Sequence, residues 1–297
     1  MLIYELVEKC NMRNESKIIQ KQCEGCTYGD ECPHDCKKCL EYVHFPNRAP
    51  EMRHYDCVHM ADCYYCKYSF RYASEIVYGL KQFADIRKKD NLRVMSVGCG
   101  PCTELAAIDY LRHQNYLNYK GLEFLGIDPL DEVWVNIWGD IKKYFGGGIY
   151  FLNKNMLEIV DVIIEKQWVP DLIIFQYVFS DMYKNHKQED IENFIEKLAA
   201  FLDGQIGKSI YILANDTNLS IQYSGGREFF DILRNKIRMP KIIREYHFDN
   251  MNREKHYEYG EEYRRNDLVF DNIPDEIHEL YEPFESCTSA QLLIKKT

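Results

Sequence analysis

From about residue 90 to the C-terminus, short β-rich segments alternate with helical segments, and this order constrains the fold more than any other feature. The β-rich segments are expected at residues 93–97, 123–127, 149–152, 172–176, 209–214, 242–248 and 291–295, and the intervening helices at 103–113, 132–144, 157–166, 189–202 and 226–236. Strands that alternate with helices of this length form a mostly parallel sheet with helices packed on both faces. The sequence therefore predicts an α/β fold.

The composition limits the function classes without choosing among them. The chain has 297 residues, 46% of them hydrophobic, which is enough for one large α/β domain and a small additional unit. No stretch approaches the roughly 20 apolar residues of a membrane span, and the N-terminus lacks the basic and apolar regions of a secretory leader. We therefore expect a soluble cytoplasmic protein with no membrane partner. The formal net charge of −10 excludes a broadly basic nucleic-acid surface.

A glycine-containing turn follows the first expected strand. The residues Val97-Gly98-Cys99-Gly100-Pro101 lead directly into a helix. Glycine lets the backbone approach a ligand closely, and the helix N-terminus offers free N–H groups and the positive end of a dipole. The second expected strand ends in Gly126-Ile127-Asp128, whose carboxylate can accept hydrogen bonds from both ribose hydroxyls of an adenosyl group. Thr103 stands where the dinucleotide-binding G-x-G-x-x-G motif requires glycine, so that motif is absent.

These two motifs resemble those of the class I S-adenosylmethionine-dependent methyltransferases, and the resemblance covers about residues 70–297. It implies a Rossmann-like sheet of seven strands, the last of them antiparallel, with helices on both faces. The sequence departs from the family pattern at Ser96, where an acidic residue is frequent, and at Cys102, where a third glycine is frequent. By the same resemblance the cofactor is S-adenosylmethionine, and the residues expected to hold it are Gly98, Cys99, Gly100, Pro101, Asp128, Asn155, Met156 and Gln176. Met156 could equally be a core residue.

In this family the residues that handle the methyl acceptor follow the fourth strand. Tyr177, Asp181 and His186 are therefore candidates for acceptor contact or proton removal. The segment contains neither the Asn-Pro-Pro-Tyr motif of enzymes that methylate exocyclic amines nor the cysteine nucleophile of cytosine-C5 enzymes. Asn215 and Asp216, after the fifth strand, are expected at the same edge of the cleft. Each of these residues could also be an ordinary loop or helix-capping residue.

Nine of the twelve cysteines lie within the first 66 residues. Without a secretory leader, clustered Cys-x-x-Cys pairs indicate metal ligands rather than disulfides. The pairs Cys23/Cys26 and Cys36/Cys39 can close one tetrahedral zinc site, the remaining cysteines can form a second, and a histidine could replace any one ligand. An iron–sulfur cluster is the alternative. The predicted ligands are Cys23, Cys26, Cys32, Cys36, Cys39, Cys57, Cys63 and Cys66.

The sequence thus predicts two units, a cysteine-rich metal-binding module at residues 1–67 and a methyltransferase-like domain at residues 68–297. The module is expected to overhang the cleft near Gly98, Tyr177 and Asp181. The function that follows is methyl transfer from S-adenosylmethionine to a macromolecular acceptor, RNA or protein. The alternatives are a non-catalytic methyltransferase-like adaptor and a small-metabolite methyltransferase with a structural zinc site.

Overall fold

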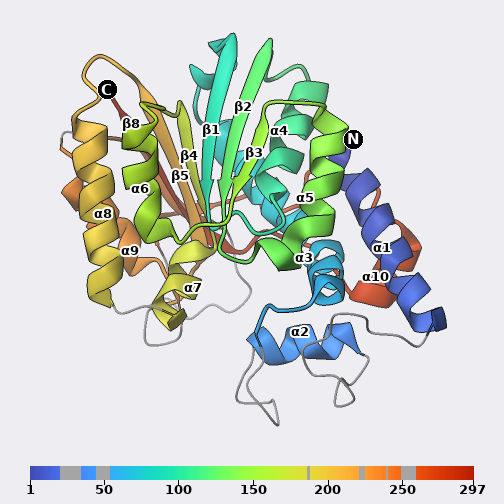
Figure 1. Ribbon diagram of the computed structural model, residues 1–297. Helices are drawn as coiled ribbons and strands as arrows, with labels where there is room; N and C mark the ends of the chain where they lie inside the picture. The colour runs from blue at the N-terminus through green and yellow to red at the C-terminus, as the bar shows by residue number, and fades with distance from the viewer. Residues whose placement is uncertain (21–34, 45–53, 186–187, 221–224, 239, 249–258) are drawn as a thin grey trace.

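The computed structural model describes residues 1–20, 35–44, 54–185, 188–220, 225–238, 240–248 and 259–297 (Figure 1). The helices are α1 (Leu2–Gln20), α2 (Cys36–His44), α3 (Val58–Leu80), the 3₁₀ helix Ile86–Lys88, α4 (Thr103–His113), α5 (Asp131–Phe145), α6 (Met156–Glu165), α7 (Val178–Asn185), α8 (Gln188–Asp203), α9 (Glu228–Lys236) and α10 (Asp275–Tyr281). The strands are β1 (Asn91–Val97), β2 (Gly121–Ile127), β3 (Ile149–Leu152), β4 (Leu172–Gln176), β5 (Ile210–Thr217), β6 (Lys241–Phe248), β7 (Glu261–Tyr263) and β8 (Ser289–Lys296). None of these described helices is both long and apolar enough to cross a membrane.

The strands form one sheet in the order β3-β2-β1-β4-β5-β8-β6-β7. Strands β1 to β5 run parallel, and β8 lies antiparallel between β5 and β6. The seven expected strands are all present, and the antiparallel last strand is confirmed. The eighth strand, β7, lies outside the seven segments that the sequence predicted as strands. It pairs with the end of β6, and the ring of Tyr263 packs 4.8 Å from that of Tyr246, a tertiary contact that a polar local sequence does not indicate.

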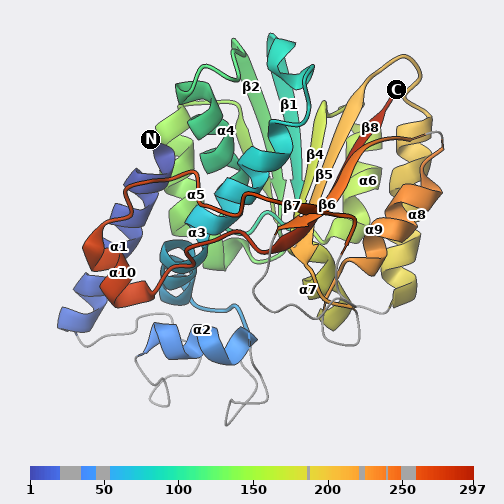
Figure 2. The same cartoon turned by 180° about the vertical axis from the view of Figure 1, so that it is seen from behind.

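Helices cover both faces of this sheet (Figures 1 and 2). Helices α1, α3, α4 and α5 pack on one face, and α6, α8 and α9 pack on the other. Along β4, Leu172 and Ile174 point into the first core, whereas Ile173 and Phe175 point into the second. A central strand that is buried on both faces is apolar at every position, which explains the continuous hydrophobic run in this segment.

Helix α3 begins at Val58, within the segment that the sequence assigned to the metal-binding module. Almost all of its side chains are buried, because α1, α2, α4 and α5 surround it. A helix that is buried on every side lacks a polar stripe, so its hydrophobic periodicity is a weak signal. Arg13 of α1 pairs with Asp62 of α3 at 2.6 Å and with Asp140 of α5 at 2.8 Å. The N-terminal helix is thereby held against the helices of the sheet domain.

Candidate cofactor and acceptor site

A cavity of about 880 Å³ opens at the carboxyl ends of β1, β2 and β4. The carboxyl edge of a parallel sheet is the usual ligand site of such folds, because loops and helix N-termini converge there. All eight residues predicted to hold the cofactor line this cavity, as do Tyr177 and Asp181. The remaining candidate, His186, lies outside the described residues.

The glycine turn between β1 and α4 forms one wall of the cavity. Gly98 has φ +62°, and a Cβ at this position would lie 2.4 Å from a methyl carbon of Val178. Gly100 has φ +46° and lies against the ring of Trp134. The positive φ favours glycine at both positions, and at Gly98 the steric clash adds to this preference. The N–H of Cys99 donates to the carbonyl of Ile127 at 3.0 Å, which fixes the turn to the end of β2.

Asp128 follows β2 and is 7% exposed. Its Oδ2 accepts from the N–H of Gly100 at 2.9 Å, and its Oδ1 accepts from the N–H of Leu130 at 2.9 Å and from Nε1 of Trp134 at 3.3 Å. Burial raises the pKa of this carboxyl to about 6. A carboxylate has about four acceptor positions. The protein occupies three of them, so acceptor capacity remains toward the cavity.

Glu104, in the first turn of α4, is a site residue that sequence reasoning missed. Ser96 Oγ donates to Glu104 Oε1 at 2.8 Å, so an acidic group lies beside the position where the family frequently has one. The other oxygen, Oε2, is buried and has no hydrogen-bond partner on another described residue. Burial raises the pKa of Glu104 to about 7. The available signal was a glutamate directly after the glycine turn, where a helix N-terminus favours negative charge.

The segment after β4 forms the opposite wall. Tyr177 has φ +57°, its ring stacks on Tyr72 at 4.3 Å, and its hydroxyl donates to Glu75 Oε1 at 3.1 Å. The amide of Gln176 donates to Glu75 Oε2 at 3.3 Å. Glu75 is fully buried, and the backbone N–H of Thr288 also donates to it, at 2.9 Å. This glutamate, which sequence reasoning also missed, fixes the cavity wall from behind.

The other candidates near this wall differ in environment. Asp181 of α7 lines the cavity and pairs with Lys184 at 3.2 Å. Asp216 is buried and accepts from the N–H of Ser180 at 3.0 Å, so it caps the start of α7. Asn215 is buried and donates to the side-chain oxygen of Gln176. Neither Asn215 nor Asp216 lines the cavity. The alternative interpretation, that each is an ordinary loop or helix-capping residue, therefore fits the structure.

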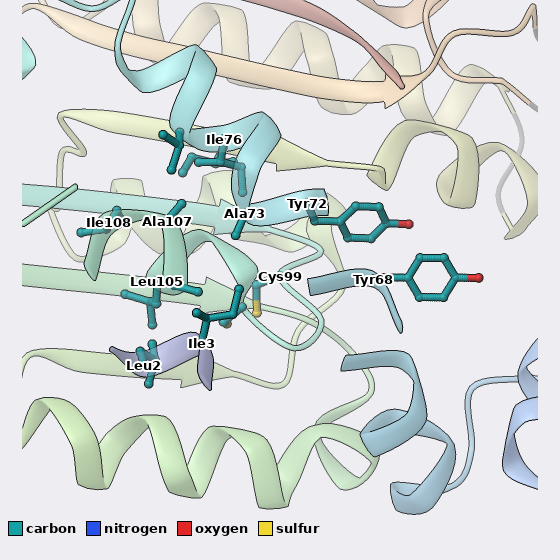
Figure 3. Packing of buried hydrophobic residues seen from close by; sticks show 14 of the residues in the cluster. Leu2, Ile3, Tyr68, Tyr72, Ala73, Ile76, Cys99, Leu105, Ala107 and Ile108 are labelled. Carbon is teal, nitrogen blue, oxygen red and sulfur yellow. The ribbon is translucent and has the colours of Figure 1, made fainter. Parts of the chain in front are cut away.

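The N-terminal segment covers the mouth of the same cavity. Five residues of α2 line it, together with His54 and Tyr55, and α2 lies at the same end of the sheet as α7 (Figures 1 and 2). Tyr55 and Tyr68 hydrogen bond to the two ring nitrogens of His44 at 2.7 and 3.3 Å. Tyr68 and Tyr72 project side by side from α3 (Figure 3). The expectation that this segment overhangs the cleft is confirmed for its described residues.

The predicted metal ligands are only partly described. Cys23, Cys26 and Cys32 lie outside the described residues. The thiol of Cys57 hydrogen bonds with that of Cys36, whereas Cys66 is buried inside α3 and its thiol donates to the carbonyl of Val7 at 3.7 Å. Within the described segments, no group of three or more His, Cys, Asp or Glu side chains is placed to hold a metal ion.

The described residues do not show the second predicted grouping of these cysteines. The second site was expected to combine Cys57, Cys63 and Cys66 with Cys32, which lies outside the described residues. The three described cysteines do not form a group that could hold a metal ion. The helix that starts at Val58 places Cys63 and Cys66 in the core between α1 and α3. Cys36 and Cys39 lie on α2 and are half-buried, and neither lines the cavity.

Neither a family model nor a curated protein matches the sequence, but many solved structures resemble this one. The plantazolicin methyltransferase BpumL in complex with SAH is 14% identical and has a TM-score of 0.44, with 97% of this chain and 100% of that chain covered. A SAM-dependent methyltransferase from Aquifex aeolicus is 12% identical with a TM-score of 0.42, covering 89% and 99% of the two chains. The precorrin-6y C5,15-methyltransferase from Geobacter metallireducens GS-15 is 11% identical with a TM-score of 0.39, covering 73% and 86%. The strand order itself, with an antiparallel β8 between β5 and β6, gives this chain the Rossmann-like α/β fold expected of class I methyltransferases.

Proposed function

We propose that this chain is an S-adenosylmethionine-dependent methyltransferase. The observation that carries the proposal is the buried Oε2 of Glu104, which lies at the cavity and lacks a partner on another described residue. Leaving such an atom unpaired costs about 1–3 kcal/mol unless a ligand supplies the missing donor. The methionyl ammonium of S-adenosylmethionine is a donor of the right charge. Asp128, on the same wall, has one acceptor position left for a ribose hydroxyl.

The remaining parts of the cofactor also find suitable groups. The N-terminus of α4 offers backbone N–H groups and a partial positive charge to the methionyl carboxylate. Met156 lines the cavity although it also packs in the second core, and Asn155 caps α6 by accepting from the N–H of Leu157 at 3.1 Å. We assign these two residues to the adenine end of the cofactor. They serve as a fixed platform because their helix is anchored in the core.

When bound, S-adenosylmethionine supplies an activated methyl group, so the protein needs only to align the acceptor and remove its proton. Tyr177 is held by Glu75 and Tyr72, which suits it to orient an acceptor. Asp181 is half-buried on α7 and lines the cavity. We assign proton removal to Asp181, with His186 as the other candidate.

The acceptor is proposed to be a macromolecule, RNA or protein, whose reacting group enters beneath α2. Burial is the largest cause that lowers the pKa of His44 to about 4. The positive charges of three nearby residues, Lys184, Arg71 and Lys67, lower it further. Positive charge beside tyrosine rings suits an acceptor that is planar or anionic. The aromatic lining of the cavity also supports a small planar metabolite as the second candidate. Ser96, at a position where the family frequently has an acidic residue, was one reason to consider a non-catalytic adaptor. Glu104 removes this reason, because its carboxyl group lies beside Ser96.

A metal site remains part of the proposal for the N-terminal segment. It is supported by the Cys-x-x-Cys spacing of Cys36 and Cys39, and by the contact of Cys36 with Cys57. Zinc is favoured over an iron–sulfur cluster for the reason given by the sequence, namely that histidine and aspartate residues interleave the cysteines.

Calorimetry with the full chain tests the cofactor assignment. S-adenosylhomocysteine should bind, and Glu104→Gln should weaken its binding because an amide cannot neutralise the ammonium. Glu123→Gln is the matched control, since Glu123 is exposed on β2 and does not line the cavity. No binding of either S-adenosylmethionine or S-adenosylhomocysteine to the folded chain would refute the proposal. Transfer of labelled methyl groups into the RNA, protein or small-molecule fraction of an extract would then identify the acceptor class.

A further inference from the structure

The glycine turn of the cofactor site also contains a Cys-x-x-Cys motif, Cys99-Gly100-Pro101-Cys102, at the N-terminus of α4. We propose that Cys99 and Cys102 form a reversible disulfide that controls cofactor binding. The control of cofactor binding rests on the proposed function, whereas the formation of the disulfide does not. A Cys-x-x-Cys pair at a helix N-terminus is the arrangement of thiol–disulfide redox motifs.

The backbone already has a geometry that a disulfide can close. The N–H of Cys102 donates to the carbonyl of Cys99 at 2.8 Å, which is the hydrogen bond of a four-residue turn. In such a turn the first and last Cα atoms lie less than about 7 Å apart, close to the range of about 4.4–6.8 Å found in disulfides. Each thiol also influences the pKa of the other, so the two side chains are neighbours. Closing the bond therefore needs rotation of side chains rather than rearrangement of the fold.

The conformation of Cys102 is a second, independent observation. Its φ is +58°, in the left-handed region, where a residue with a Cβ is strained and glycine is not. Its side chain is fully buried and makes no capping hydrogen bond to α4. A strained residue at a ligand site supports a functional hypothesis. A reaction with Cys99 would explain why this strained position holds a cysteine rather than a glycine.

The environment indicates which thiol reacts first. Cys99 lines the cavity, whereas Cys102 lies behind it. The thiolate of Cys99 would attack one sulfur of a low-molecular-weight disulfide such as oxidised glutathione, forming a mixed disulfide and releasing one thiolate. The thiolate of Cys102 then attacks the sulfur of Cys99 and releases the second. The small disulfide is reduced to two thiols, which take up the two protons. Burial raises the pKa of both cysteine thiols, that of Cys102 to about 11, so the exchange is expected to be slow.

The new bond would change the cofactor site through Gly100, which lies between the two cysteines. Its N–H donates to Asp128 at 2.9 Å and its carbonyl accepts from Nε1 of Trp138 at 2.8 Å. Cys99 is also seated against β2, because a Cβ at Gly126 would lie 2.8 Å from its sulfur. Drawing the sulfurs together to about 2.05 Å pulls on these contacts. We expect the disulfide to weaken cofactor binding and, by reciprocity, bound cofactor to slow disulfide formation.

Peptide mapping of the full chain tests the disulfide directly. Reduced protein is treated with oxidised glutathione, free thiols are alkylated, and the protein is digested with trypsin. The tryptic peptide of residues 94–112 contains only Cys99 and Cys102. It should appear unalkylated and two hydrogens lighter than the reduced peptide, and S-adenosylhomocysteine should slow this change. A peptide alkylated at both cysteines after treatment without ligand would overturn the proposal.

The effect on binding is measured separately by calorimetry. The oxidised chain should bind S-adenosylhomocysteine about ten-fold more weakly than the reduced chain, and dithiothreitol should restore the affinity. Cys102→Gly, which suits the positive φ, should abolish the response, whereas Cys287→Ser, at a buried cysteine elsewhere, should retain it. A disulfide without a change in affinity would refute the control of binding. If the reduced chain does not bind S-adenosylhomocysteine, this result would instead count against the proposed function. The peptide mapping would still show whether the disulfide forms.

Discussion

The backbone N–H of Gly100 donates a hydrogen bond to Oδ2 of Asp128 at 2.9 Å, which joins two motifs that lie 28 positions apart in the sequence. The glycine turn and the acidic end of β2 are therefore one hydrogen-bonded unit. Trp134 completes this unit, since its Nε1 donates to Asp128 and its ring lies against Gly100. A change at Asp128 consequently acts on the turn as well as on a bound ribose.

Asp128→Ala is expected to weaken the binding of S-adenosylhomocysteine by about 1–3 kcal/mol, because a ribose hydroxyl and the N–H of Gly100 lose their acceptor. Asp128→Asn should have a smaller effect, since one acceptor oxygen remains. Calorimetry measures both. Glu132→Gln, at an exposed acid in the first turn of α5, is the control and should bind normally. Equal affinities of Asp128→Ala and the unmodified chain would contradict the assignment of the ribose.

Cofactor affinity should depend on pH through Glu104. Burial raises the pKa of Glu104 to about 7, so the carboxyl is largely neutral below pH 7. An ammonium group binds the ionised form, and affinity should therefore fall about ten-fold as the pH is lowered from about 7.5 to about 6. Asp128, with a pKa of about 6, adds to the fall only near the lower end.

The control for this pH dependence is Glu104→Gln, which should bind more weakly at neutral pH and show a flatter profile. The comparison uses calorimetric titrations at several pH values in buffers of equal ionic strength. An unchanged pH profile in Glu104→Gln would show that another group is responsible.

Tyr177→Phe is expected to lower the free energy of unfolding by about 1 kcal/mol, because Glu75 loses one of its hydrogen-bond donors while the ring still stacks on Tyr72. Urea denaturation measures the change. Tyr183→Phe, on the exposed side of α7, should leave the stability unchanged. If Tyr177 also orients the acceptor, Tyr177→Phe should lower the rate of methyl transfer more than it lowers cofactor affinity. Parallel losses in rate and cofactor affinity would argue against that role.

Elemental analysis of protein purified without added metal should find one or two zinc ions per chain. Cys36→Ser and Cys39→Ser should reduce the zinc content, whereas Cys66→Ser should not, because Cys66 is buried in α3 and donates to Val7. Iron with a visible charge-transfer band would support the iron–sulfur alternative. Protein that contains neither metal would leave the cysteines of α2 without a metal function.

The sequence by itself determined seven of the eight described strands, the main helices between them, the glycine turn and the position of Asp128. These features are local: hydrophobic runs, turn residues and a short motif depend only on neighbours along the chain. The same reasoning located the edge of the sheet where the cavity lies, because the carboxyl ends of parallel strands meet there.

Only the tertiary structure decided which distant residues meet. Glu104 supplies an acid beside Ser96, and Glu75 of α3 fixes Tyr177, through contacts across separate elements. Cys63 and Cys66 resembled metal ligands in a polar, cysteine-rich stretch, yet they belong to a buried helix. Local pattern cannot distinguish these outcomes. Burial on every side removes the periodicity that marks a helix, and a side chain's partners depend on how helices pack against the sheet.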